Sequence, residues 1–403
     1  MRPACIDISL LNTFQQICCF QTAITSFLNR NLRIYIKGYM LKISKFLGVN
    51  MRTQVSITVD TEFSIAGAFR DPTACPVAEP RVWCVTDYKS QGLGYMLDCF
   101  AQYGITATFF VEVLNRHYFQ RDPMREIAEK LHTAGHDVQL HLHPCWTVFQ
   151  YEDWRERARV RTKPSIDAFY GRAEDESLKL MEYGLETFHT WGLPSPTVFR
   201  SGSLHHDDAL YRAQARAGIP YSSHVGVAVF DSGDENYRLY SGRHVRHGVI
   251  ECPILTFRDW KVPGKTHLKS LTITGSNFAE TRMLLEQAHR EGVEQVVILT
   301  HPFEYVHASD LQMSRMRRHH VNQRRLARLC QFLSENTDRF ATDGLSAAAA
   351  MPMRAESSRN VLLKGSLLKA VPRMVEQAAY DKYAMWRLKH QEAAPVADVE
   401  ACA

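Results

Sequence analysis

The sequence lacks a long apolar run, a regular cysteine spacing and an excess of charge in its main body. No apolar run of about 18 residues or more occurs, so no membrane-spanning helix is expected. None of the ten cysteines stands in a CxxC spacing, which excludes a zinc ribbon and a small disulfide-rich fold. This cysteine usage is typical of a reducing compartment, and we expect a cytoplasmic protein.

The formal net charge of +5 belongs to one end of the chain. Residues 1–50 carry six basic side chains and one acid, Asp7, whereas the other 353 residues carry 42 basic and 42 acidic side chains. A neutral body lacks the basic face that releases counterions from nucleic acid, so no nucleic-acid partner is expected.

Residues 1–50 form a basic leader in which polar residues interrupt the apolar pattern, unlike a secretory signal. Two interpretations remain open. The leader could lie on a membrane surface, which would place the protein at the inner face of the membrane. Alternatively, it is not part of the working protein, and Met51, directly before the first clear strand, is the true start.

From residue 54 onward, strand and helix patterns alternate. Typical segments are the strand QVSITVD, the helix LGYMLDCFAQY closed by Gly104, the strand ITATFFVEV and the helix PMREIAEKLHTAG. Alternation of this kind predicts parallel pairing and an α/β fold. We expect one barrel-like domain over 51–346, followed by a helical C-terminal extension over 347–403. The basic run RMRRHH near its end is expected on an exposed helix face.

Four predicted strands end in polar side chains where core residues would be usual. The carboxyl ends of parallel strands lie at one edge of the sheet, where active sites gather. Residues two apart on a strand face the same side. Carboxylate and imidazole groups suit zinc, and also iron, cobalt or nickel, so a hydrolytic metal site is predicted. The side chains are Asp60 and Glu62 in VDTE, His141 and His143 in LHLHP, Arg200 in FRSG and His301 in LTHP.

Each of these features alone has a structural explanation, such as a salt bridge for Arg200 or a strand cap for His301. The prediction depends on their occurrence at four strand ends of one chain. His205 follows the Arg200 strand and could line the site or lie in a solvated loop.

With these residues, the chain resembles the polysaccharide deacetylase family, the NodB-homology domain of carbohydrate esterase family 4. The matching segments, in family order over about 55–303, are TVDTE, ITATFF, AGHDVQLHLHP, FRSG and VVILTHP. Two departures stand out: the second acid is displaced to Glu62, and Cys145 stands where the family places its second metal histidine. The chain is thus similar to an outlying branch found with surface-polysaccharide or lipopolysaccharide genes.

The resemblance implies a distorted barrel of seven or eight parallel strands and a role for each matched residue. Asp60 would be the general base, His301 would protonate the leaving amine, and Arg200 would orient Asp60. A divalent metal, with zinc as the first choice, would be held by Glu62, His141 and His143.

The expected substrate is an N-acetylated sugar of a surface polysaccharide or its precursor. Trp146 could stack on a sugar ring, although core packing is an equal alternative, and His205 is a second candidate contact. Two other functions are retained: hydrolysis of another non-peptide C–N bond, as in a cyclic ureide, and an inactive carbohydrate-binding module. The departures in VDTE and LHLHP motivate the last one.

Overall fold

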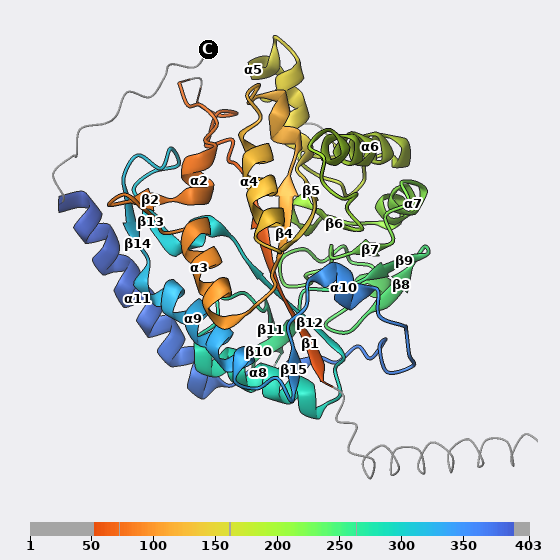
Figure 1. Ribbon diagram of the computed structural model, residues 1–403, viewed down its shortest axis with the longest axis vertical. Helices are drawn as coiled ribbons and strands as arrows, with labels where there is room; N and C mark the ends of the chain where they lie inside the picture. The colour runs from red at the N-terminus through yellow and green to blue at the C-terminus, as the bar shows by residue number, and fades with distance from the viewer. Residues whose placement is uncertain (1–51, 72, 161–162, 263, 391–403) are drawn as a thin grey trace, which may run out of the picture. The chain divides into compact units, whose positions relative to one another are not determined.

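The computed structural model describes residues 52–71, 73–160, 163–262 and 264–390. The basic leader and both interpretations of it therefore lie outside the described residues. The described unit is an α/β fold with a mostly parallel central sheet, as the alternating pattern predicted (Figure 1).

The central sheet has nine strands, and its ladder is parallel from β12 through to β9. Strand β8 adds an antiparallel edge, and β15 pairs with the start of β1 in parallel. In spatial order the strands are β12 (Gln295–Thr300), β1 (Thr53–Thr61), β4 (Thr108–Glu112), β5 (Asp137–Leu142), β6 (Val198–Ser201), β7 (Tyr221–Ser222), β9 (Val249–Glu251) and β8 (His244–Arg246), with β15 (Phe340–Ala341) beside β1.

The predicted distorted barrel is confirmed only as an α/β fold with a mostly parallel sheet. In the described part of the chain, no continuous ladder joins the β8 edge to β12. Single bridges lie along β12 instead, from Ile254 to Val297 and from Thr272 to Leu299. The sheet therefore curves without closing.

Helices follow the strands as the amphipathic segments predicted. In α3, Leu93, Met96 and Phe100 are fully buried, and Gly104 ends the helix at φ 64°, a conformation that glycine adopts without strain. The longer helices are α3 (Leu93–Tyr103), α4 (Pro123–Thr133), α6 (Glu174–Thr190), α7 (Asp208–Arg216), α8 (Phe278–Arg290), α9 (His320–Ser334) and α11 (Leu367–His390). The short ones are α2 (Glu79–Trp83), α5 (Trp154–Arg157) and α10 (Leu345–Ala349).

Short strands and 3-10 turns complete the unit. The hairpin of β10 and β11, with β16 beside β10, was not predicted, because its mixed polar sequence lacks a clear period. The strands are β10 (Thr256–Val262), β11 (Lys265–Ser270), β16 (Leu363–Lys364), β13 (Val306–Ala308), β14 (Met316–Arg318), β2 (Val85–Thr86) and β3 (Lys89–Ser90). The 3-10 turns are η1 (Leu114–His117), η2 (Pro144–Gln150), η3 (Gly202–Leu204), η4 (Glu235–Tyr237) and η5 (Pro302–Tyr305). The run RMRRHH was predicted on an exposed helix face, but it forms β14 and the start of α9, with His319 buried at the helix cap.

The main apolar core packs around β1 in the centre of the sheet. Every residue of β1 is buried, and Phe100, Phe109, Leu284 and Leu329 belong to the main apolar cluster around it. No helix among the described residues is long and apolar enough to cross a bilayer. Of the described cysteines, Cys75 is disulfide-bonded, and five have free thiols: Cys84, Cys99, Cys145, Cys252 and Cys330.

Candidate functional site

The carboxyl ends of β1, β5, β6 and β12 bring the predicted polar residues to one edge of the sheet. The register pairs His141 with Arg200 across β5 and β6, and β1 lies between β12 and β4. Asp60, His141 and Arg200 are almost fully buried there, with 4%, 1% and 0% of their surface exposed. Buried polar groups of this kind need partners, and each finds one within the site.

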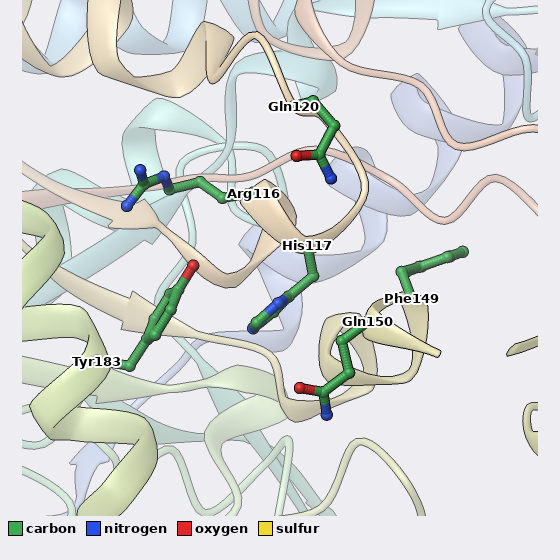
Figure 2. Close-up of a pocket in the computed structure, with 6 residues that line it drawn as sticks. All are labelled: Arg116, His117, Gln120, Phe149, Gln150 and Tyr183. Atoms are coloured by element: carbon green, nitrogen blue, oxygen red, sulfur yellow. The ribbon is translucent and has the colours of Figure 1, made fainter. Parts of the chain in front are cut away.

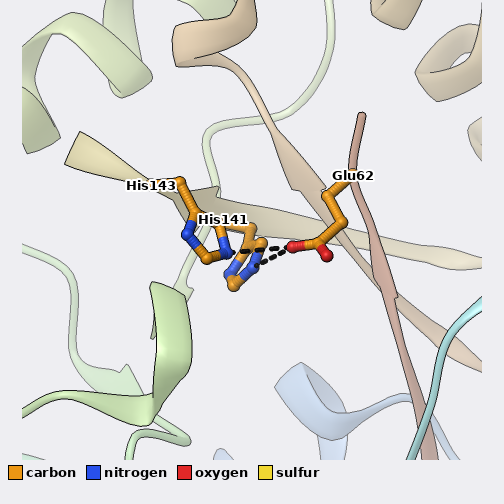
Figure 3. Close-up of side chains that lie close together, drawn as sticks. All are labelled: Glu62, His141 and His143. Atoms are coloured by element: carbon orange, nitrogen blue, oxygen red, sulfur yellow. Dashed lines mark ion pairs between the residues drawn. The ribbon is translucent and has the colours of Figure 1, made fainter. Parts of the chain in front are cut away.

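Glu62, His141 and His143 converge on one point, as Figure 3 shows. The Oε2 atom of Glu62 lies 2.9 Å from Nε2 of His143 and 3.4 Å from Nε2 of His141. One ligand atom from each of the three side chains lies within 4.8 Å of the other two. This spacing and this donor set fit a divalent cation.

The outer ring nitrogens of the two histidines are already engaged. Nδ1 of His141 lies 2.8 Å from the carbonyl oxygen of Arg200, and Nδ1 of His143 lies 2.9 Å from Oδ2 of Asp167. If each Nδ1–H donates to its oxygen, the Nε2 lone pair is left facing Glu62, which is the tautomer a metal ligand needs. The hydrogen bonds at the two Nδ1 atoms thus support the fit to a cation.

The electrostatics of the three residues favour a positive charge between them. Burial alone would raise the pKa of Glu62, but the charge of His143 and hydrogen bonds from both imidazoles outweigh burial and hold it well below its usual range. Burial alone would lower the pKa of His143, yet the carboxylates of Asp167 and Glu62 raise it well above its usual range. A proton or a metal cation can supply that charge.

Asp60 is held by Arg200 beside this cluster. Nη1 of Arg200 donates to Oδ1 of Asp60 at 2.6 Å and to Oγ1 of Thr58 at 3.0 Å. The rest of the guanidinium donates to Ser223 and lies 4.1 Å from the centre of the Phe110 ring. The second carboxylate oxygen of Asp60 is left facing His301, whose Nε2 lies 4.0 Å away.

The surroundings of His301 raise its pKa above the ordinary value. Burial lowers its pKa, but Glu304, with smaller contributions from Asp60 and Glu62, raises it to about 9. Oε1 of Glu304 lies 3.3 Å from Nδ1 of His301, and its Oε2 accepts from the His301 backbone N–H. The proton on Nε2 is therefore directed toward Asp60.

The two predicted substrate contacts have different outcomes. For Trp146, the structure has the core packing that was the alternative to stacking on a sugar. Its side chain is only 2% exposed and packs against Phe119 and Phe149, because η2 turns its ring into the core. No ring face of Trp146 is left for a sugar. His205 is half-buried beside Phe230, and its pKa is lowered by burial although nearby Asp167 acts in the opposite direction. Its role as a substrate contact stays a prediction.

Three acids of the site were missed by the sequence analysis. Glu112 ends β4 and accepts from the backbone N–H of His143 at 3.2 Å, so the rule of polar residues at strand ends could have identified it. Glu304 stands three residues after His301 at the start of η5, where a capping acid is typical. Asp167 lies in an irregular segment, and no sequence signal marks it.

A separate cavity of about 370 Å³ lies near the ends of β4 and β5 (Figure 2). The ring of His117 stacks on that of Tyr183 there, with 5.0 Å between centroids. None of the three cation-site residues lines this cavity. The lining residues are Arg116, His117, Gln120, Phe149, Gln150 and Tyr183.

No protein-family model and no curated protein sequence matches this chain. Several solved structures are similar over most of its length. One is a candidate polysaccharide deacetylase from Mycobacterium smegmatis, at 17% identity and a TM-score of 0.45, with 79% of this chain and 96% of that chain covered. A family 4 carbohydrate esterase from Streptomyces lividans has 11% identity and a TM-score of 0.34, with 77% and 98% covered.

A family 4 pseudoenzyme from Bacillus anthracis is similar too, at 10% identity and a TM-score of 0.34, with 74% of this chain and 66% of that chain covered. The similar structures thus include both an enzyme and a pseudoenzyme. At these identities and scores the likeness carries no functional conclusion, which depends on the side chains of the site.

Proposed function

We propose that this chain is a metal-dependent hydrolase of a non-peptide C–N bond that removes an N-acetyl group from a sugar of a surface polysaccharide or its precursor. One observation carries the proposal: three side chains that could hold a cation lie beside a buried aspartate and a histidine at a single sheet edge. That combination supplies a metal, a base and an acid for amide hydrolysis.

Glu62, His141 and His143 would hold the cation through one carboxylate oxygen and two Nε2 atoms. Two imidazoles and a carboxylate form a usual catalytic zinc set with an open position, while cobalt, nickel and iron also accept these ligands. When bound, such a cation polarises the amide oxygen and lowers the pKa of water at the site.

Asp60 would take the proton of the attacking water. Arg200 balances its charge and fixes one oxygen, so the other oxygen keeps its orientation toward the reacting atoms. This fixed geometry lowers the entropic cost of the attack. His301 would then donate its Nε2 proton to the departing nitrogen, so that the products are acetate and a free amino sugar.

The experiment uses the full chain, reconstituted with zinc and dialysed. Elemental analysis is expected to give one zinc ion per chain, and N-acetylhexosamine oligomers are expected to release acetate. Asp60→Asn should keep the metal and lose acetate release by about 100-fold or more, as expected for loss of a general base. His141→Ala should lose both, whereas His189→Ala, which changes an exposed histidine, should lose neither.

A wild-type chain without bound metal, or a His141→Ala variant with full activity, would contradict the proposal. Opening of small cyclic amides without acetate release would place the substrate in the ureide class instead. Metal and glycan binding without turnover, across zinc, cobalt, nickel and iron, would identify an inactive binding module.

A further inference from the structure

Arg81 on α2 lies directly beside the residues of the proposed cation site. Its Nη2 atom is 3.5 Å from Oε1 of Glu62, and its side chain is 20% exposed. The ion pairs of His141 and His143 run to the other oxygen of Glu62, Oε2, as the dashed lines in Figure 3 show. A guanidinium thus stands at the partly open rim of the site, within reach of a molecule bound there.

Packing fixes the position of this guanidinium. Its central carbon lies 3.6 Å from the ring centre of Phe303, which is close enough for a cation–π contact. The Phe303 ring packs in turn against the ring of His301, with 5.0 Å between centroids. At the end of α2, the Cys84 sulfur lies 3.3 Å from the carbonyl oxygen of Arg81 and 3.8 Å from that of Pro302. These contacts hold α2 against η5, so the donors of Arg81 are oriented before a ligand arrives.

The N–H donors of Arg81 have few acceptors. A guanidinium carries five such donors in a fixed plane. Among the residues that the structure describes, the Arg81 guanidinium has one ion pair and donates no hydrogen bond, and its Nε atom is buried without a partner. The guanidinium of Arg200, at the same sheet edge, donates four hydrogen bonds. A ligand that supplies acceptor oxygens to the Nη groups of Arg81 would explain the difference.

The charges of the site also favour an anion at this rim. Arg200 has an acid of its own, because Asp60 lies 2.6 Å away and both side chains are buried. Arg81 has only Glu62, which is also the carboxylate of the proposed cation site. Because Glu62 would share its charge with the cation, the guanidinium keeps a positive charge that an anionic ligand can balance.

We propose that Arg81 binds an anionic oxygen group of the substrate, a carboxylate or a phosphate, and that the acetylated sugar carries such a group. The planar fork of a guanidinium gives two parallel hydrogen bonds to either oxyanion. A neutral sugar would leave this fork to water. The assignment rests on the proposed function and narrows its substrate to anionic N-acetylated sugars.

The test compares three derivatives of N-acetylglucosamine as substrates of the full chain loaded with zinc. They are the neutral methyl glycoside, the 1-phosphate, and the 3-O-lactyl ether, which carries a carboxylate. We expect kcat/KM for acetate release to be at least about tenfold higher for one of the anionic sugars than for the methyl glycoside, as for a charged hydrogen-bonded pair. Preference for the 1-phosphate would assign a phosphate-linked precursor, and preference for the lactyl ether would assign a sugar acid.

Arg81→Met should reduce this anion preference by about tenfold or more, mainly through KM, because methionine keeps the contact with Phe303 and loses the donors. Arg81→Lys should restore only part of the preference, since it keeps the charge without the planar fork. Circular dichroism checks that both variants fold.

The matched control is Arg339→Met. Arg339 also lies beside a phenylalanine ring, with its guanidinium carbon 5.4 Å from the ring centre of Phe340. Phe340 pairs with Thr53 at the start of β1, whereas the site lies at the other end of that strand. The control should keep the wild-type anion preference.

Binding is measured apart from turnover by calorimetric titration of the zinc-loaded Asp60→Asn chain with the 1-phosphate and the lactyl ether. The Kd of the preferred sugar is expected to rise by about tenfold or more in Asp60→Asn/Arg81→Met. Acetate release without any anion preference would leave the proposed function standing and refute the role of Arg81. Binding that depends on Arg81, with no acetate release from any sugar, would do the reverse.

Two further results would overturn the proposal. Arg81→Met could lower kcat/KM for all three sugars equally and weaken zinc binding, measured by competition with a fluorescent chelator. That outcome would make Arg81 a positioning residue for Glu62. Alternatively, the anion preference could persist in Arg81→Met while inhibition by acetate weakens, which would place Arg81 at the acyl group.

Discussion

Asp167 orients His143 from outside the ligand cluster. Its carboxylate is hydrogen-bonded to Nδ1 of the ring. Burial raises the pKa of Asp167, but the charge of His143 and this hydrogen bond lower it more, so Asp167 is ionised at neutral pH. A carboxylate behind a histidine ligand fixes the tautomer and makes the facing nitrogen a better donor. Asp167 is therefore a positioning residue for the proposed cation site.

Asp167→Asn tests that role. We expect zinc affinity to fall by about 10- to 100-fold, because the amide keeps the shape but loses the charge. Competition with a fluorescent chelator measures the change. Asp153→Asn, which alters an exposed partner of Arg157, is the control and should leave the affinity unchanged. An unaltered affinity in Asp167→Asn would remove Asp167 from the cation site.

Glu304 raises the pKa of His301 and so extends the pH range over which its ring is protonated. The pKa of His301 is about 9, so the acid form is present below that pH and is lost as the pH rises through it. Glu304→Gln removes the strongest of the contributions that oppose burial, and it should move the basic limb of the pH–activity profile for acetate release to lower pH. Glu286→Gln changes a distant acid and should leave the limb in place. An unshifted limb in Glu304→Gln would assign it to another group.

At the scale of elements, the turn after β6 sets the space available to His143. A Cβ atom at Gly202 would lie 2.5 Å from Nδ1 and 2.6 Å from Cε1 of the His143 ring. Contacts this close do not occur between real atoms, and the ring is tied to both Glu62 and Asp167. The glycine in FRSG is therefore required by close approach to the ligand.

Gly202→Ala should displace the His143 ring and lower zinc affinity by about tenfold or more, with the β6 strand intact. The chelator assay measures it, and far-ultraviolet circular dichroism checks the fold. Gly94→Ala is the matched control: its Cβ would lie 2.6 Å from Cβ of Ser90, an equally close contact remote from the ligands. Equal zinc affinities in the two variants would show that the turn does not constrain His143.

At the scale of the whole molecule, α11 is joined to two separate elements through one arginine. Arg373 pairs with Asp259 of β10 and with Glu280 of α8, and Glu280 is fully buried. Removing the guanidinium would leave two carboxylates buried without their partner, which costs more than the pair itself contributes.

Arg373→Met should lower the free energy of unfolding by about 3–5 kcal/mol. Urea denaturation followed by circular dichroism measures the change. Arg282→Met breaks the exposed pair with Glu286 and should cost less than about 1 kcal/mol. A similar small loss in both variants would mean that α11 is not held by the Arg373 pairs.

Much of the fold could be predicted from local patterns. The segment LGYMLDCFAQY forms α3 with the predicted bounds, because its apolar spacing and Gly104 specify a helix and its end. The strands that carry Asp60, His141, Arg200 and His301 were predicted too, and parallel pairing brings their ends together. The hairpin of β10 and β11 and the open edge of the sheet were not, since pairing between distant segments leaves no local period.

The sequence by itself determined the α/β fold and the convergence of the strand-end residues, since periodicity and parallel topology are properties of local chemistry. Only the tertiary structure decided which side chains form hydrogen bonds and ion pairs with partners far away in the sequence. Asp167 reaches His143 across 24 positions and Arg373 reaches Glu280 across 93. An amphipathic pattern also defines two faces of α11 without saying which one is buried, and here buried carboxylates on β10 and α8 draw the polar face inward.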